Sequence, residues 1–101
     1  MPGVGKLLKE AQKMQTRIQE AQAKLATESF NASVAGGAVV ATVNGKGELT
    51  GLTLEAEFLK EGAAEVSAMI VSAVQQAQAS ATKASEDTMG AFTGQFKGML
   101  G

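Results

Sequence analysis

Residues 39–54 read VVATVNGKGELTGLTL, in which two runs of alternating apolar and polar residues lie on either side of Asn44-Gly45-Lys46-Gly47. Such runs around an Asn-Gly pair predict a β-hairpin, because both central residues of a type I′ turn have positive φ. Gly47 indicates instead a longer loop or a bulge. Within each predicted strand the apolar residues share one face, and they are Val39, Ala41, Val43, Leu52 and Leu54.

Helices are predicted on both sides of this hairpin, which spans about residues 33–55. Residues 6–29 are rich in good helix formers, with Pro2 and Gly3 expected before the helix. The apolar residues of this helix recur at alternating steps of four and three, a heptad pattern: Leu7, Ala11, Met14, Ile18, Ala21 and Leu25. Residues 59–87 form the second predicted helix, whose apolar stripe weakens towards alanines: Val66, Ile70, Ala73, Ala77, Ala81 and Ala84. The glycine-interrupted residues 88–101 predict a flexible tail, and the sequence leaves open whether it is ordered.

The chain has few large side chains with which to build a core. Its 101 residues, expected to form a single domain, include four Phe, no Trp and no Tyr, and the absence of Cys excludes disulfides. A lone two-stranded hairpin is marginally stable in water. We therefore expect an α+β protomer of order α-β-β-α, in which the hairpins of two chains form one antiparallel sheet in a homodimer with long projecting helices. The alternative is a monomer whose helices fold back over the hairpin. The expected dimer interface consists of Val39, Ala41, Val43, Leu52 and Leu54.

The composition argues against an enzyme. Neither His nor Cys is present, which removes the usual general base and the usual zinc ligands. Glu55 and Glu57 have no evident acid–base partner and are interpreted as solvent-facing charges. We expect no cofactor, no metal and no small-molecule substrate. The longest strongly apolar run, residues 68–74, is far too short to span a membrane, and no secretory signal is evident, so a cytoplasmic location without membrane contact is expected.

The charges are distributed unevenly along the chain. Residues 1–30 carry five Lys or Arg and three Glu, whereas the remainder carries four Lys and seven acidic residues. At about 100° per residue, the five cations fall in one sector of the first helix, roughly 110° from the heptad seam. Such a stripe suits contacts to phosphates, although a solvated helix face is the alternative interpretation. Lys83 and Lys97 are secondary candidates. The predicted DNA-binding residues are Lys6, Lys9, Lys13, Arg17 and Lys24.

Three stretches together resemble one known family over nearly the whole chain. They are the helix LLKEAQKMQTRIQEAQAKL, the hairpin AGGAVVATVNGKGELTGLTL and the helix VSAMIVSAVQQAQASATKASEDTMG. The sequence resembles the YbaB/EbfC family of bacterial nucleoid-associated DNA-binding proteins. The family commonly shows Ile-Asp-Pro after the second strand, where this chain has Leu54-Glu55-Ala56. The acidic residue is kept in kind, and alanine stands in place of the family's proline in the loop before the second helix.

The resemblance implies an α+β homodimer with projecting helical arms that binds double-stranded DNA with low sequence specificity and without catalysis. Its implied location is the nucleoid, where such proteins organise the bacterial chromosome and influence gene regulation. A dimeric helical scaffold that binds protein partners is the alternative function, favoured by the net charge of −1 and the heptad seam.

Overall fold

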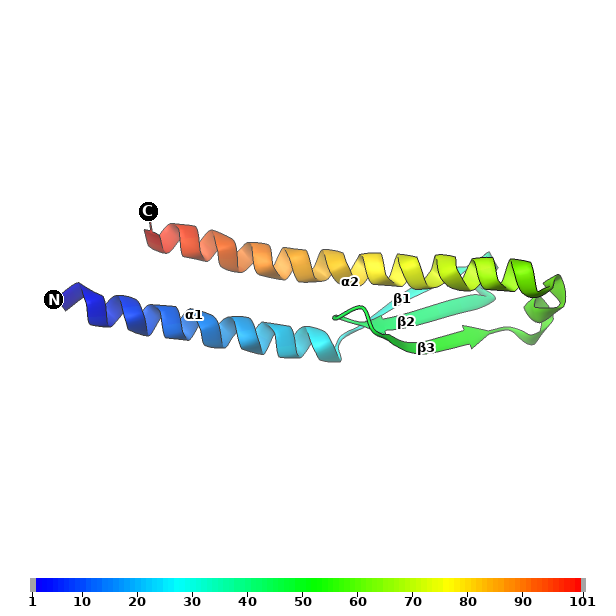
Figure 1. Ribbon diagram of the computed structural model, residues 1–101, viewed down its shortest axis with the longest axis horizontal. Helices are drawn as coiled ribbons and strands as arrows, with labels where there is room; N and C mark the ends of the chain where they lie inside the picture. Colours follow the sequence, from blue (N-terminus) through cyan, green and yellow to red (C-terminus); the bar gives the residue numbers. More distant parts are fainter. Residues whose placement is uncertain (1, 101) are drawn as a thin grey trace.

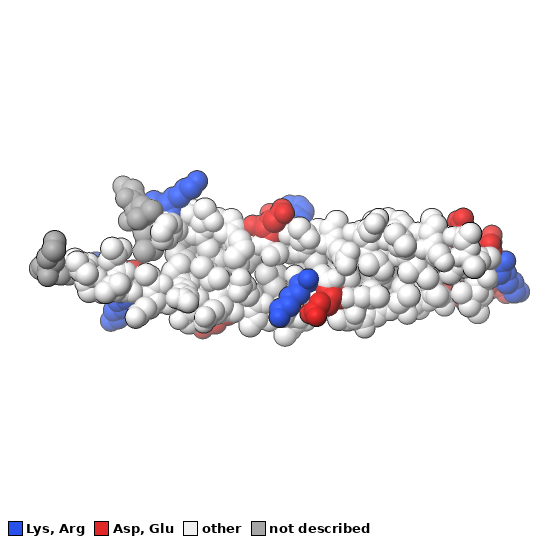
Figure 2. All heavy atoms as spheres, viewed as in Figure 1, with Lys and Arg blue, Asp and Glu red and all other residues white. Residues whose placement is uncertain are grey.

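The computed structural model describes residues 2–100, which form a rod of 72 × 21 × 17 Å (Figure 1, Figure 2). A small sheet occupies one end of the rod, and two long antiparallel helices extend from it to the other end, where both termini lie (Figure 1). The elements are α1 (Pro2–Thr27), β1 (Ser29–Val34), the 3₁₀ turn η1 (Ala35–Gly37), β2 (Val39–Asn44), β3 (Leu49–Leu54), the 3₁₀ turn η2 (Ala56–Glu61) and α2 (Ala63–Leu100). The predicted α+β protomer with long helices is confirmed.

The sheet has three antiparallel strands in the order β1-β2-β3, one more than the sequence analysis predicted. The predicted hairpin is β2–β3. The additional strand follows α1, which ends at Thr27. It contains Ser29, assigned from sequence to the end of the first helix, and Ser33 and Val34, assigned to the hairpin. Its pattern has period two, because Phe30, Ala32 and Val34 are half-buried while the residues between them are exposed. The Ser and Asn residues between them make this a weak strand signal in sequence.

The turn between β2 and β3 is longer than a type I′ turn. Asn44 Oδ1 accepts hydrogen bonds from the backbone N–H groups of Lys46 (2.9 Å) and Glu48 (3.1 Å). Positive φ occurs at Gly47 (+81°) and not at Asn44 or Gly45, so the type I′ prediction is wrong and the longer loop is confirmed. The register also shifts between Thr42 and Val43, a bulge on the β3 side of the ladder.

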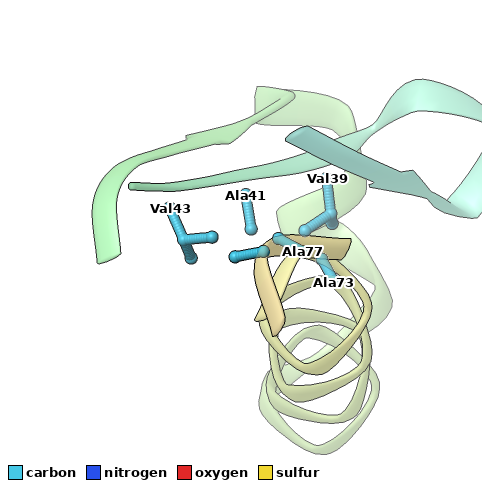
Figure 3. Packing of buried hydrophobic residues seen from close by; sticks show 6 residues of the cluster. Val39, Ala41, Val43, Ala73 and Ala77 are labelled. Atoms are coloured by element: carbon cyan, nitrogen blue, oxygen red, sulfur yellow. The ribbon is translucent and has the colours of Figure 1, made fainter. Parts of the chain in front are cut away.

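The core lies where α2 crosses β1 and β2 (Figure 3). The side chains of Val39, Ala41 and Val43 on β2 face Ala73 and Ala77 of α2. Ala81 belongs to the same cluster, and all six side chains are at most 1% exposed. Alanine has no atoms beyond Cβ, so α2 can lie close against the sheet. In this structure α2 of the same chain covers Val39, Ala41 and Val43, which the sequence assigned to a dimer interface.

Both helices are longer than the sequence predicted. α1 begins at Pro2, because proline is tolerated in the first turn of a helix, where its missing N–H has no acceptor in any case. α2 continues to Leu100, so the predicted tail is helical, with Gly101 outside the described residues. The glycines that suggested a break recur every four residues on an exposed side of α2, whereas Met89 and Phe92 are half-buried beside α1.

Candidate nucleic-acid interface

The arm is defined here as α1 together with residues 82–100 of α2. Its two helices contact each other through apolar side chains that line one shared cleft: Met14, Ile18, Met89, Phe92 and Phe96. Met14 is 8% exposed, and Leu25, where α1 meets the sheet, is equally buried. The predicted heptad seam of α1 is therefore covered from Met14 to Leu25, whereas Leu7 and Ala11 are exposed. The remaining sides of α1 face solvent.

The five predicted DNA-binding cations all lie exposed on α1, and they are called the basic stripe: Lys6, Lys9, Lys13, Arg17 and Lys24. The structure brings three of them together around one shallow groove on the α1 surface, which Gln12, Thr16 and Glu20 also line. Lys6 lies beyond this groove near the N-terminus, and Lys24 lies in the last turn of α1. A cation in that turn also stabilises the helix macrodipole.

Among the described residues, one ion pair involves a cation of the basic stripe. The Nζ of Lys13 lies 3.9 Å from Glu10 Oε1, and both side chains are about half exposed, so this pair contributes little and leaves Lys13 available. On α2, Lys83 forms an exposed ion pair with Asp87 at 3.1 Å, which weakens its candidacy as a DNA contact. Lys97 lies exposed in the last turns of α2.

The two ends of the rod differ in charge. The arm carries seven Lys or Arg and four Asp or Glu, whereas residues 28–81 carry two Lys and six Glu. Figure 2 shows blue Lys or Arg side chains at the end where the termini lie and red carboxylates beside blue at the opposite end. An anionic polymer is therefore attracted to the arm more than to the sheet.

β1 and β3 are the two edge strands of the sheet, and α2 packs over β1 and β2, which leaves the side chains of β3 less covered. Leu54 is half-buried and Leu52 is 40% exposed, and both pair with core residues of β2, which places them on the α2 side of the sheet. Leu49 is 49% exposed and joins the same face, because the bulge pairs it with Val43. Leu49 was not among the residues predicted from sequence, because simple alternation places it on the other face of the strand from Leu52. In the sequence, Gly47 indicated a possible bulge.

Residues 2–100 contain no group of three or more His, Cys, Asp or Glu that could hold a metal ion. Among the same residues, no helix is both long enough and apolar enough to cross a membrane. The fold and surface define a class of protein: an α+β chain with a projecting, cation-bearing helical arm and no evident catalytic constellation.

Comparison with known proteins agrees with this class. Residues 1–96 match the model of the YbaB/EbfC DNA-binding family, to which the chain belongs. It is 39% identical to a nucleoid-associated protein of Cutibacterium acnes, with 85% of this chain and 81% of that protein covered. It is 34% identical to a nucleoid-associated protein of a Caulobacter species, with 100% and 94% covered. The family is nucleoid-associated and non-enzymatic.

A solved structure supports the fold separately. The crystal structure of an uncharacterized protein from Helicobacter pylori superposes with a TM-score of 0.60, covering 82% of this chain and 94% of the other. The two sequences are 21% identical. The long helix, three-stranded sheet and long helix are therefore shared at low sequence identity.

Proposed function

We propose that this protein binds double-stranded DNA as a homodimer, with low sequence specificity and without catalysis, by placing the basic stripe against the phosphates. The observation that carries the proposal is the position of five exposed cations in one sector of an arm that projects from the sheet. A family of DNA-binding proteins and relatives named nucleoid-associated support DNA as the ligand.

The spacing of the stripe suits a regular polyanion. Lys9, Lys13 and Arg17 follow one another at four-residue intervals, which separates them by about 6 Å along the helix axis. A duplex presents one phosphate charge per about 1.7 Å of its axis, so each cation finds a phosphate within reach in many registers. α1 contains no aromatic residue with which to stack on bases. These features favour contacts that do not depend on base sequence.

A second chain completes the proposed binding unit. β3 is an edge strand, so its outer backbone N–H and C=O groups are available to pair with another strand. Leu49, Leu52 and Leu54 belong to this edge strand, and antiparallel pairing with β3 of a second copy would cover part of their exposed surface. Among the described residues, six small side chains form the fully buried core of each chain, and the added burial would stabilise both copies. The dimer would present two basic stripes to one duplex.

Charge reversal within the stripe tests DNA binding. Lys13→Glu combined with Arg17→Glu is expected to weaken binding about tenfold or more on every duplex sequence, and to lower the slope of log affinity against log salt by about 1.8 per chain. The measurement is fluorescence anisotropy with duplexes of different sequence at several salt concentrations. Lys46→Glu with Lys60→Glu makes the same change in net charge outside the arm and serves as the control. Equal losses in the two double variants would contradict a role for the stripe.

The proposed dimer is tested at the β3 edge. Leu52→Asp is expected to shift the protein towards single chains in sedimentation velocity, since it places a charge where two copies would meet. Val71→Asp replaces an apolar residue that is 54% exposed on α2 and is expected to leave the mass unchanged. A wild-type protein that sediments as one chain at micromolar concentration would refute the pairing.

A helical scaffold for protein partners is the second candidate function. It is favoured by Val4, Leu7 and Leu8, which are 49–60% exposed on α1 and could contact another helix. The two functions are separated by retention on a DNA column that salt abolishes, compared with recovery of a stoichiometric protein from a nuclease-treated lysate.

A further inference from the structure

The end of the arm combines apolar and cationic side chains. α1 extends past the end of α2 (Figure 1), so its first turns lack the neighbouring helix that covers Met14 and Ile18. Among the described residues of this overhang, the large apolar and basic side chains are called the arm tip: Val4, Lys6, Leu7, Leu8 and Lys9. Leu7 is 55% and Leu8 60% exposed, and both lysines are exposed.

The opposite end of the rod combines an apolar side chain with carboxylates. η2 connects β3 to α2 there (Figure 1), and Leu59 of this turn is 52% exposed. Lys60 pairs with Glu57 at 3.2 Å, although both side chains are largely exposed. Four exposed carboxylates around Leu59 outnumber this single lysine, and with Leu59 they are called the acidic end: Glu55, Glu57, Glu61 and Glu65.

We propose that the arm tip of one copy binds the acidic end of another, so that the protein associates head to tail. Each surface brings exposed leucine that gains by leaving water. The two surfaces carry opposite net charges, because Lys6 and Lys9 outnumber Glu10, the one carboxylate beside them. Contact between two arm tips would bring Lys6 and Lys9 against their own copies, and this repulsion disfavours the symmetric arrangement.

The proposed contact differs in kind from pairing at β3. Two different surfaces meet, so the contact is heterologous, and a rod joined end to end in this way leaves free ends for further copies. Neither surface includes β3, so head-to-tail association uses residues other than those of the proposed dimer. The contact itself does not depend on DNA binding.

The strength of the contact should depend on salt and concentration. Each surface is small, and its charges are exposed, so their attraction extends over about 8 Å at physiological ionic strength and about 3 Å at 1 M salt. Larger species are therefore expected in concentrated protein at low salt and should dissociate at 1 M salt. If the proposed DNA binding holds, copies on one duplex would meet at high local concentration.

Complementary charge reversals provide the test, read by sedimentation velocity of nuclease-treated protein. Variant one carries Glu57→Lys and Glu61→Lys, and variant two carries Lys6→Glu and Lys9→Glu. Each alone has two ends of like sign and is expected to lose the species larger than the dimer. An equimolar mixture restores opposite charges at every junction and is expected to regain them. Glu20→Lys with Glu86→Lys reverses two charges between the ends and should assemble as the wild type does.

The apolar part of the contact has its own variants. Leu8→Ser and Leu59→Ser alter half-exposed side chains, so the fold should persist by circular dichroism while larger species are lost at low salt. Assembly that survives in variant one but disappears in Leu8→Ser would indicate tip-to-tip contact and overturn the proposal. Wild-type protein without larger species at low salt, or a mixture that fails to regain them, would also overturn it.

DNA binding is measured separately on the same proteins. Variant one retains the whole basic stripe, so its affinity for a short duplex should be no lower than that of the wild type. Failure of the head-to-tail proposal would leave this affinity intact. Failure of the proposed DNA binding would instead appear as weak binding of the wild type to the short duplex, whatever its state of association.

Discussion

In the half of α2 that covers the sheet, small side chains are fully buried, whereas in the half that belongs to the arm, large side chains are partly exposed. Over the sheet, Ala73 and Ala77 are completely removed from solvent, whereas in the arm Phe92 is half-buried and Phe96 is 49% exposed. The sheet is a broad surface that lies against the helix backbone when only methyl groups intervene. In the arm, one helix meets one other helix, and much of each aromatic ring stays in contact with water.

The comparison shows that the opposing element, more than the size of a side chain, determines how deeply a residue is buried. It also divides the rod into a region held by dense packing and a region held by a narrow seam. We expect local opening to be easier in the arm than over the sheet. The following variants test this division, in order of decreasing effect.

The largest effect is expected from Ala77→Leu. The side chain is 0% exposed between α2 and β2, so three added carbon atoms would force the helix away from the sheet. The free energy of unfolding should fall by about 3 kcal/mol, measured by urea unfolding at fixed protein concentration. Ala68→Leu adds the same atoms at an exposed position of α2 and should change it by less than about 0.5 kcal/mol. Similar losses in both would refute dense packing at Ala77.

Gly45→Ala should cost somewhat less, about 2 kcal/mol. A Cβ at this position would overlap the carbonyl group of Leu25, which accepts a 2.9 Å hydrogen bond from the Gly45 N–H. The thermal unfolding midpoint should fall accordingly. At Gly51 the nearest atom to an added Cβ is Thr42 Cβ at 3.7 Å, an ordinary contact, so Gly51→Ala should be tolerated. An unchanged midpoint in Gly45→Ala would show that α1 and the turn do not approach so closely.

Phe92→Ala should lower the free energy of unfolding by about 1–2 kcal/mol, roughly half the cost for a fully buried Phe, because the ring is only half-buried. Hydrogen exchange should quicken in both arm helices while the strands keep their protection. Phe96→Ala removes a more exposed ring and should have a smaller effect. Equal acceleration in the strands and the arm would argue against two regions of different stability.

Gly94→Ala should have the smallest effect and the opposite sign. The position is helical and exposed, with open space around an added Cβ. Alanine is favoured over glycine in a helix by about 0.5–1 kcal/mol, so the arm should become more stable. Gly62→Ala is the contrasting variant, since φ is +97° there and the change should be destabilising. A loss of stability in Gly94→Ala would contradict the helical assignment of this segment.

Local periodicity predicted much of the fold. The β2–β3 hairpin, the seam of α1 and the alanine stripe of α2 were all readable, because each depends on residues close in sequence. β1 was missed, since Ser29, Asn31 and Ser33 dilute its alternation. The C-terminal part of α2 was also missed, because its glycines are unfavourable in a helix. Its helical structure is explained by the packing of Met89 and Phe92 against α1, which the sequence does not show.

The candidate sites were predicted less evenly. The sequence placed the basic stripe on an exposed side of α1, where the structure also has it, because helix geometry fixes that position. Contact with DNA stays a prediction. For Val39, the sequence identified an apolar face but not the element that covers it, which depends on how far α2 extends. Leu49 could not be assigned to this face from sequence, because the bulge in β3 shifts the alternation and places Leu49 on the opposite face from the one expected.

The hairpin turn is fastened from both sides. The N–H of Gly45 bonds to α1 through Leu25, and the carbonyl of Gly47 accepts a 3.1 Å hydrogen bond from Nε2 of Gln78 in α2. A load that pulls the start of α1 away from the end of α2 would first break the side-chain contacts nearest those two points. Further separation would require breaking the hydrogen bonds that join the β2–β3 turn to α1 and to α2, which involve main-chain atoms as well as a side chain. We therefore expect the two helices to separate within the arm and to stay joined at the turn.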